Sequence, residues 1–248
     1  MDAIYILWLR ELKRYTRSRS QLVASLAQPT LYLLALGFGL GPVFRRAGEG
    51  SYLQFVAPGV IGMVVLFAAM FSGIALLWDR QFGFLKETLV APVPRLAIVV
   101  GRSLGGATVA MLQGILMIIA CLIAGFRPAG LGALPLGLAF MALIATPFVA
   151  LGVAIGSGLQ DMQGFQLIMS FLVMRIFFFS GALFPLHGLS RALALVAAAD
   201  PLTYGVDGLR GALIGASHFH MATDAAVLVG ASITLLCIGA WRFSKIEV

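Results

Sequence analysis

The sequence has 248 residues, of which 60% are hydrophobic and only 11% are charged. A soluble domain is nearer a quarter charged, so this composition excludes an ordinary water-soluble protein. The formal net charge is +7, but the basic residues form no single patch, and membrane topology explains their placement better than nucleic-acid binding does.

Residues 1–20 predict an amphipathic helix at the membrane interface. Apolar residues such as Leu7 and Trp8 recur on one helical face, and basic residues are spaced along the other. The basic residues are Arg10, Lys13, Arg14 and Arg17. We expect the apolar face to sink into the headgroup boundary while the basic face meets anionic lipid or a protein partner, two interpretations that do not exclude each other.

Six apolar runs are long enough, or nearly so, to cross the ~30 Å core of a bilayer as helices. They predict spans at residues 22–43, 54–78, 98–124, 133–158, 163–184 and 224–242. Both chain ends then lie on one side of the membrane, and that side carries eleven Lys and Arg residues against five on the other. By the positive-inside rule, the side with eleven is cytoplasmic.

The segment at residues 79–95, between the second and third spans, is too long for a simple connection. Short helix–helix connections run ~2 to 8 residues. Pro92 and Pro94 would end a short helix before the third span begins. We expect this helix to dock on a cytoplasmic partner, the alternative being a solvated or lipid-facing loop. Its apolar and charged surfaces would be formed by Phe82, Phe84, Leu85, Lys86, Glu87 and Leu89.

Arg175 is an anomaly because it lies about 12 residues into the fifth span, roughly 18 Å deep at the helical rise. A charge at that depth costs ~2.5 kcal/mol or more unless it faces a cavity or a partner. Two alternatives remain open: Arg175 lines a transport path, or it pairs with an external aspartate, Asp200 or Asp207. The aromatic run that follows it could stack on cargo and comprises Phe177, Phe178 and Phe179.

The external segment at residues 185–221 is too apolar for an ordinary solvated loop. It predicts two short helices, Leu189 to Ala199 and Tyr204 to Ile214, broken at Asp200-Pro201. Neither could cross a bilayer, so we expect them to re-enter the membrane and return. The residues that we expect to define this segment are Asp200, Pro201, Tyr204, Asp207 and Arg210.

Enzymatic signatures are missing from the sequence. Only three lysines occur and none follows a glycine, so the phosphate-binding loop of an ATPase is absent. Ser157 has no histidine in a nearby span to activate it, and His218 with His220 lacks a third metal ligand. We therefore expect no catalytic, cofactor-binding or metal-binding residue on this chain.

Three stretches together resemble one family. They are FLKETLVAPVPRLAIVVGR after the second span, FFFSGALFPLHGLSRAL at the end of the fifth, and DPLTYGVDGLRGALIG in the external segment. They are similar to the permease subunits of ABC-2 type exporters, which include polysaccharide, lipo-oligosaccharide and antibiotic exporters. The resemblance covers essentially the whole chain, although Arg175 departs from the family pattern.

The resemblance implies a multi-pass protein of the bacterial plasma membrane with both termini in the cytoplasm. It implies two permease copies, surrounded by membrane lipid, and a separate nucleotide-binding ATPase subunit that holds ATP and Mg and docks at residues 79–95. Residues 1–248 would form one transmembrane domain, an all-α integral membrane protein with six transmembrane helices. We expect it to export an amphipathic or lipid-linked substrate, either a drug or antibiotic or a glycan. A secondary transporter and a membrane-bound lipid-modifying enzyme are the alternatives.

Overall fold

The computed structural model describes residues 2–46, 51–82, 93–130, 132–159 and 161–244. These residues form helices and connections without any strand, which confirms the all-α prediction. In chain order the helices are α1 (Asp2–Arg17), α2 (Arg19–Gly39), α3 (Gly41–Arg46), α4 (Tyr52–Gln81), α6 (Arg95–Ile123), α7 (Ala133–Gly158), α8 (Met162–Phe179), α9 (Arg191–Ala199), α10 (Pro201–Ile214) and α11 (Met221–Ser244).

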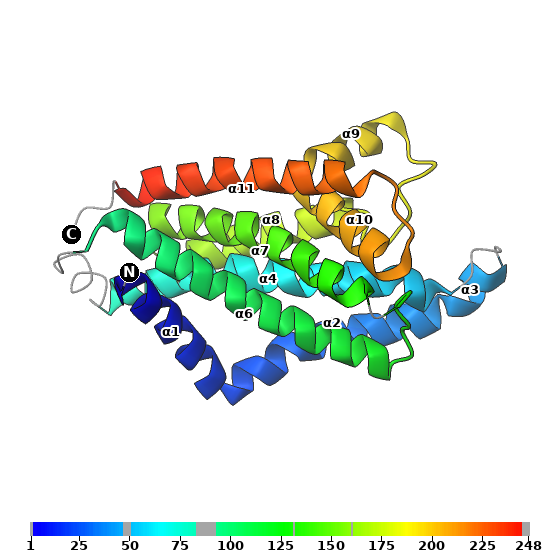
Figure 1. Ribbon diagram of the computed structural model, residues 1–248, viewed down its shortest axis with the longest axis horizontal. Helices are drawn as coiled ribbons and strands as arrows, with labels where there is room; N and C mark the ends of the chain where they lie inside the picture. The colour runs from blue at the N-terminus through cyan, green and yellow to red at the C-terminus, as the bar shows by residue number, and fades with distance from the viewer. Residues whose placement is uncertain (1, 47–50, 83–92, 131, 160, 245–248) are drawn as a thin grey trace.

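Five of the described helices are long and apolar enough to cross a membrane: α4, α6, α7, α8 and α11. They run along the long axis of the molecule, with both termini at one end and α9 and α10 at the other (Figure 1). The helix α2 is not one of the five, and its first half carries polar residues such as Gln21 and Gln28. Five of the six predicted spans are therefore confirmed as helices of sufficient length and hydropathy.

The helix α4 forms the centre of the bundle. In its most apolar stretch 72% of the residues are buried, and it packs against α2, α6, α7, α8 and α10, most extensively against α7. Glycines allow the close approach of α4 and α7: a Cβ atom built on Gly73 would lie 2.1 Å from the carbonyl oxygen of Gly152. Small residues at such positions are a common means of packing membrane helices.

Local sequence signals explain where the short external helices begin and end. The Asp200 carboxylate accepts a hydrogen bond from the backbone N–H of Leu202, and Pro201 occupies the first turn of α10, where a missing N–H is tolerated. Gly215 ends α10 with a φ of 72°, which is left-handed and suits glycine. The predicted break at Asp200-Pro201 is confirmed, whereas α10 begins three residues earlier than predicted.

The helix α8 ends earlier than the predicted fifth span. It stops at Phe179, because Ser180 caps it and Gly181 turns the chain with a φ of 69°. Residues 180–184 are therefore not part of α8. The chain returns from there toward α9 and α10 at the same end of the bundle (Figure 1).

Candidate functional site

The N-terminal helix α1 lies along the first half of α6. The indole Nε1 of Trp8 donates a hydrogen bond of 3.0 Å to the Thr108 hydroxyl, and a Cβ atom on Gly101 would lie 3.0 Å from the Cβ of Leu7. The face predicted to sink into lipid is thus largely covered by α6. Tyr5 and Ile6 are the exposed apolar side chains instead, because the tertiary contact selects a different face from the one expected for an isolated amphipathic helix.

Ion pairs join α1 to α4 and α6 near the end that carries the termini. Asp79, at the end of α4, is buried and accepts hydrogen bonds from Arg102 of α6 and from Arg10 of α1. Arg14 pairs with Glu11, one turn apart on α1, and burial raises the pKa of the Glu11 carboxyl. Three guanidinium groups therefore share two carboxylates. Lys13 and Arg17, the other predicted basic residues of α1, are exposed.

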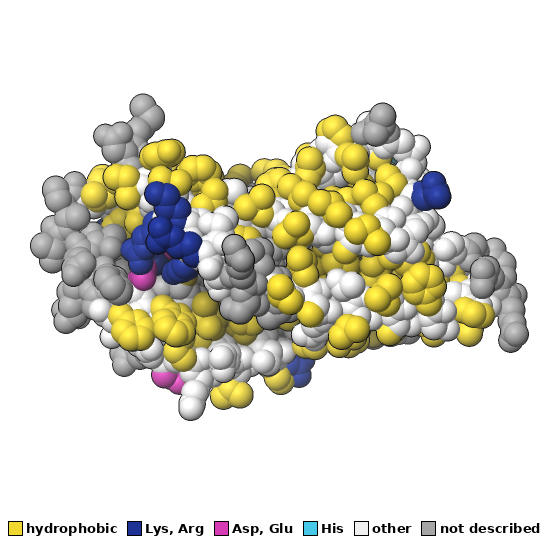
Figure 2. Space-filling model, turned by 90° about the horizontal axis from the view of Figure 1, so that it is seen from below, with side chains coloured by type: hydrophobic (Ala, Val, Ile, Leu, Met, Phe, Trp, Pro, Cys, Tyr) yellow, Lys and Arg dark blue, Asp and Glu magenta, His cyan; other side chains and the backbone are white. Residues whose placement is uncertain are grey.

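A cavity of about 810 Å³ lies between α1, α2, α4 and α6, beside these ion pairs. Arg10, Arg14, Gln28 and Gln113 contribute polar groups to its lining, while α4 contributes an apolar wall. Figure 2, seen from the side of α1 and α2, shows lysine and arginine side chains gathered near the end of the molecule that carries the termini, with hydrophobic side chains around them. Neither the cavity nor the pairing of Asp79 was predicted.

Only the edges of the predicted coupling segment are described. Phe82 is exposed and its ring stacks on that of Trp78, with centroids 5.4 Å apart. Phe84, Leu85, Lys86, Glu87 and Leu89 lie outside the described residues, so this prediction is not tested.

At the opposite end, α10 is held in the bundle by a buried arginine. The Arg210 guanidinium donates to the Gly181 carbonyl oxygen at 3.1 Å and lies over the Phe55 ring, 4.0 Å from its centroid. Burial lowers the pKa of Arg210 to about 10. A nearby hydrogen bond joins the Tyr52 hydroxyl to the Leu183 carbonyl oxygen at 2.8 Å. These contacts fix the turn after α8 against α4 and α10.

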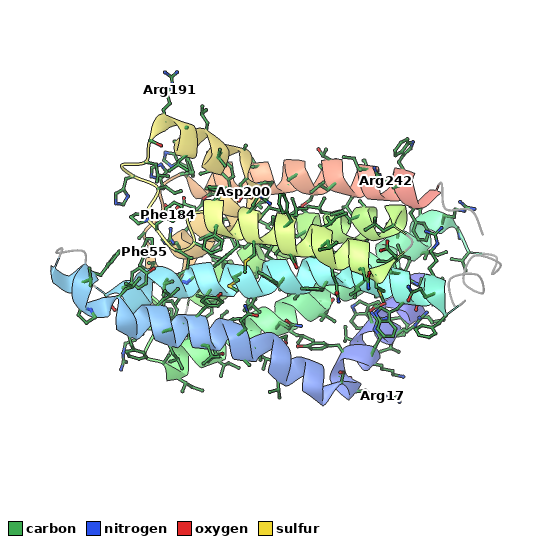
Figure 3. All side chains as sticks on the ribbon, turned by 180° about the vertical axis from the view of Figure 1, so that it is seen from behind. Arg17, Phe55, Phe184, Arg191, Asp200 and Arg242 are labelled. Atoms are coloured by element: carbon green, nitrogen blue, oxygen red, sulfur yellow. The ribbon has the colours of Figure 1, made fainter. Side chains whose placement is uncertain are left out.

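The two predicted external aspartates act as helix and loop caps. Asp207 accepts hydrogen bonds from the backbone N–H groups of His218 and Phe219, at 2.7 to 2.9 Å. Asp200 caps α10, and burial raises the pKa of its carboxyl to about 7, although the hydrogen bond from Leu202 acts against that rise. The hydroxyl of Tyr204 donates to the Ala198 carbonyl oxygen at 3.0 Å. Figure 3 shows Phe55 and Phe184 toward the end of the molecule that carries α9 and α10, Arg242 toward the other end, and Asp200 between them.

Arg175 lies on the exposed side of α8. Its Nη1 donates to the Phe171 carbonyl oxygen at 3.1 Å, and its guanidinium carbon is 3.1 Å from the centroid of the Phe171 ring. Among the described residues no ion pair joins Arg175 to Asp200 or Asp207, whose carboxylates accept backbone N–H groups, and the role of Arg175 stays a prediction. Of the aromatic run, Phe177 is buried and Phe178 is exposed, so these rings do not share one face.

Comparison with known proteins identifies the family. The family model of the ABC-2 type transporter matches residues 2–214. Nodulation protein J of Rhizobium leguminosarum bv. trifolii is 30% identical over 238 residues, which cover 94% of this chain and 84% of that protein. The inner membrane transport permease YadH of Escherichia coli strain K12 is 26% identical over 229 residues, which cover 92% of this chain and 89% of YadH.

A match over most of the chain, together with five apolar helices of spanning length, establishes the family and the membrane location together. ABC transporters couple transport to a nucleotide-binding subunit or domain, so this membership implies an ATPase partner. The resemblance noted in the sequence is confirmed. The chain belongs to the ABC-2 type transporter family and is a membrane-spanning transport permease of that family.

Proposed function

We propose that this chain is the membrane subunit of an ABC exporter, in which two copies form a path for an amphipathic or lipid-linked substrate. The observation that carries the proposal is the presence of polar side chains on the outward face of α8, among exposed apolar ones such as Leu167 and Phe171. In the most apolar stretch of α8 only 22% of the residues are buried, and its exposed positions include Gln166, Ser170 and Arg175. Such side chains at membrane depth are costly against lipid and favour a facing protein or water.

The contrast with α11 supports this assignment. In α11 only 17% of the most apolar stretch is buried, and the exposed side chains inside that helix are mostly apolar, among them Val229, Ile233 and Ile238, with Thr234 as a polar one. That pattern suits contact with lipid tails. Both helices are largely exposed in one copy, but α8 exposes a charged side chain, Arg175, inside its span and is the better candidate for the face between two copies.

Two further features suit a cargo that is both polar and apolar. Arg175, Phe178 and Phe179 line a shallow depression of about 380 Å³ on α8. A guanidinium beside aromatic rings suits either an aromatic drug or antibiotic or a glycan, which can stack on the same rings. A secondary transporter remains the alternative that Arg175 favours, and a lipid-modifying enzyme is the weaker one.

The topology completes the proposal. We take α2 as the sixth span, α1 as the interfacial helix, and α9 with α10 as re-entrant helices within one domain of residues 1–248. Both termini would lie in the cytoplasm of a bacterium and the chain in its plasma membrane, as the excess of basic residues at that end favours. ATP and Mg would bind the partner subunit, which would dock at residues 79–95.

Cross-linking between copies tests the face. In a Cys237→Ser background, where buried Cys121 is the remaining native thiol, Ser170→Cys on α8 should give a disulfide-linked dimer in membranes. Ile233→Cys on α11 is the matched control and should not. A dimer formed through α11 alone would contradict the proposed arrangement.

Coupling is tested separately. Leu85→Asp should leave the permease in the membrane but weaken co-purification of the ATPase subunit and ATP-driven uptake into inverted vesicles, because a charge would replace an apolar docking side chain. Glu87→Lys should act in the same direction. Normal association and uptake in both variants would make the segment a simple loop. Uptake that needs an ion gradient and no ATP would favour the secondary transporter.

A further inference from the structure

The cavity between α1, α2, α4 and α6 is separate from the face proposed for transport. Its described lining comes from these four helices and from Phe82, and none of it comes from α8. Its volume of about 810 Å³ lies within the ~300 to 1,000 Å³ typical of small-molecule sites. A transport path between the α8 helices of two copies would not include this cavity, so the cavity is a candidate for a separate binding site.

One wall of the cavity is a continuous apolar stripe along α4. The lining residues recur every three or four positions, which places them on one helical face. Phe82 lies 19 residues after Met63, so the stripe is ~28 Å long at the helical rise. One leaflet of a bilayer, including its headgroups, is only ~20 Å thick, so the stripe is longer than the part of a leaflet that one acyl chain occupies. The large apolar side chains of the stripe are Met63, Phe67, Phe71, Ile74, Trp78 and Phe82.

The polar end of the cavity is lined by arginine side chains. Arg10 and Arg14 line it, with Glu11 and Asp79 as their partners, while Arg102 shares Asp79 from the α6 side. Among the residues that the structure describes, these three guanidinium groups share two carboxylates. Arg14 is 44% exposed and uses one of its donors on Glu11, so its guanidinium can still donate to an anion.

We propose that this cavity binds one anionic lipid molecule, with its phosphate at Arg10 and Arg14 and one acyl chain along the apolar stripe of α4. An inorganic anion would leave the stripe unfilled, and a zwitterionic lipid would place its own cation beside the guanidinium groups of Arg10 and Arg14. The lipid would lie beneath α1 and join it to α4, in addition to the ion pairs. The bound lipid is a permanent component of the permease and not its cargo.

Native mass spectrometry of the purified permease tests the proposal, with phosphatidylglycerol and phosphatidylcholine as probes. The wild type should retain one phosphatidylglycerol in preference to phosphatidylcholine. Arg14→Gln should weaken retention by about tenfold, the effect of one charge-assisted hydrogen bond. Lys13→Gln is the matched control, because it removes the same charge from an exposed neighbour that does not line the cavity, and it should retain the lipid.

A second variant tests the chain site without changing any charge. Ala68 lines the cavity on α4, so Ala68→Trp should fill it and displace the acyl chain. Equal lipid retention by this variant, by Arg14→Gln and by the wild type would overturn the proposal. So would an equal preference for the two lipids.

The last arm separates a resident lipid from cargo. Phosphatidylglycerol with a fluorescent headgroup should remain bound when the complex with its ATPase hydrolyses ATP. Release or translocation of that lipid with each round of hydrolysis would make the cavity part of the transport path and would overturn the assignment as a resident lipid. Because retention is measured on the permease alone, failure of the exporter proposal would leave this result interpretable.

Discussion

Replacing Asp79 with Asn should destabilise the permease strongly, because it leaves a buried cation without its partner. The Asp79 and Arg102 side chains are each 5% exposed, whereas Arg10, the second partner of Asp79, is 38% exposed. Removing one member of a buried ion pair costs ~3–5 kcal/mol. Removing the exposed member of an ion pair at the surface costs only ~0–1 kcal/mol. Asp79→Asn should therefore be several-fold more damaging than Arg10→Gln.

The assay is thermal unfolding of the purified variants in one detergent. In a protein of this size each kcal/mol shifts Tm by ~2–4 °C, so Asp79→Asn should lower Tm by ~6–20 °C and Arg10→Gln by ~4 °C at most. The double variant Asp79→Leu with Arg102→Met should recover most of the loss, because an apolar pair of similar volume removes the buried charges and Arg10, which also loses Asp79, is 38% exposed. Equal shifts for Asp79→Asn and Arg10→Gln would refute the reasoning, since they would mean that Arg102 does not depend on Asp79.

Three further outcomes are expected. Gly152→Ala should lower Tm, because its Cβ would lie 2.4 Å from the Met70 carbonyl oxygen. The control Gly230→Ala, whose Cβ would have nothing within 4 Å, should leave Tm unchanged or raise it. Equal effects of the two variants on Tm would argue against tight α4–α7 packing. Asp200 has a folded-state pKa of about 7 against 3.8 for the free group, so the unfolded chain loses this proton first and the free energy of unfolding should fall between about pH 4 and pH 7. Asp200→Asn keeps a capping side chain and should flatten that fall in Tm measured against pH; an unchanged slope would exclude this carboxyl as its cause. Arg175→Leu should preserve membrane insertion but change transport rate or substrate preference in vesicles, and normal transport of every substrate would place Arg175 outside the path.

Apolar periodicity and proline were sufficient to predict most of the helices. Runs without charge predicted α4, α6, α7, α8 and α11 to within a few residues, except for the end of α8. The break at Asp200-Pro201 was predictable because proline restricts the residue before it. The end of α8 was missed because Gly181 lies within an apolar stretch that hydropathy does not distinguish from a helix.

Contacts between distant helices were not predictable from the same signals. The pairing of Asp79 with Arg102 depends on α4 and α6 lying side by side, and the two residues are 23 positions apart. Both stand near the ends of predicted spans, which is a usable but weak signal. The capping contacts of Asp200 and Asp207 were not predicted either, because their backbone N–H donors lie within a few residues or on the adjoining loop. The positions of charged residues in the sequence do not show which carboxylates will accept backbone N–H groups as caps.

The central position of α4 has a consequence for how the protein is made. Its apolar sequence can enter the bilayer alone, but its most extensive packing partner, α7, and the external helix α10 are synthesised later. Glycines such as Gly62 and Gly73 remain exposed to lipid until those helices arrive, and Val206 of α10 then lies 3.0 Å from where a Cβ of Gly62 would be. Insertion and assembly are therefore distinct stages. A ribosome stalled after α6 would leave an inserted but incompletely packed helix, the form in which membrane quality-control proteases would meet this protein.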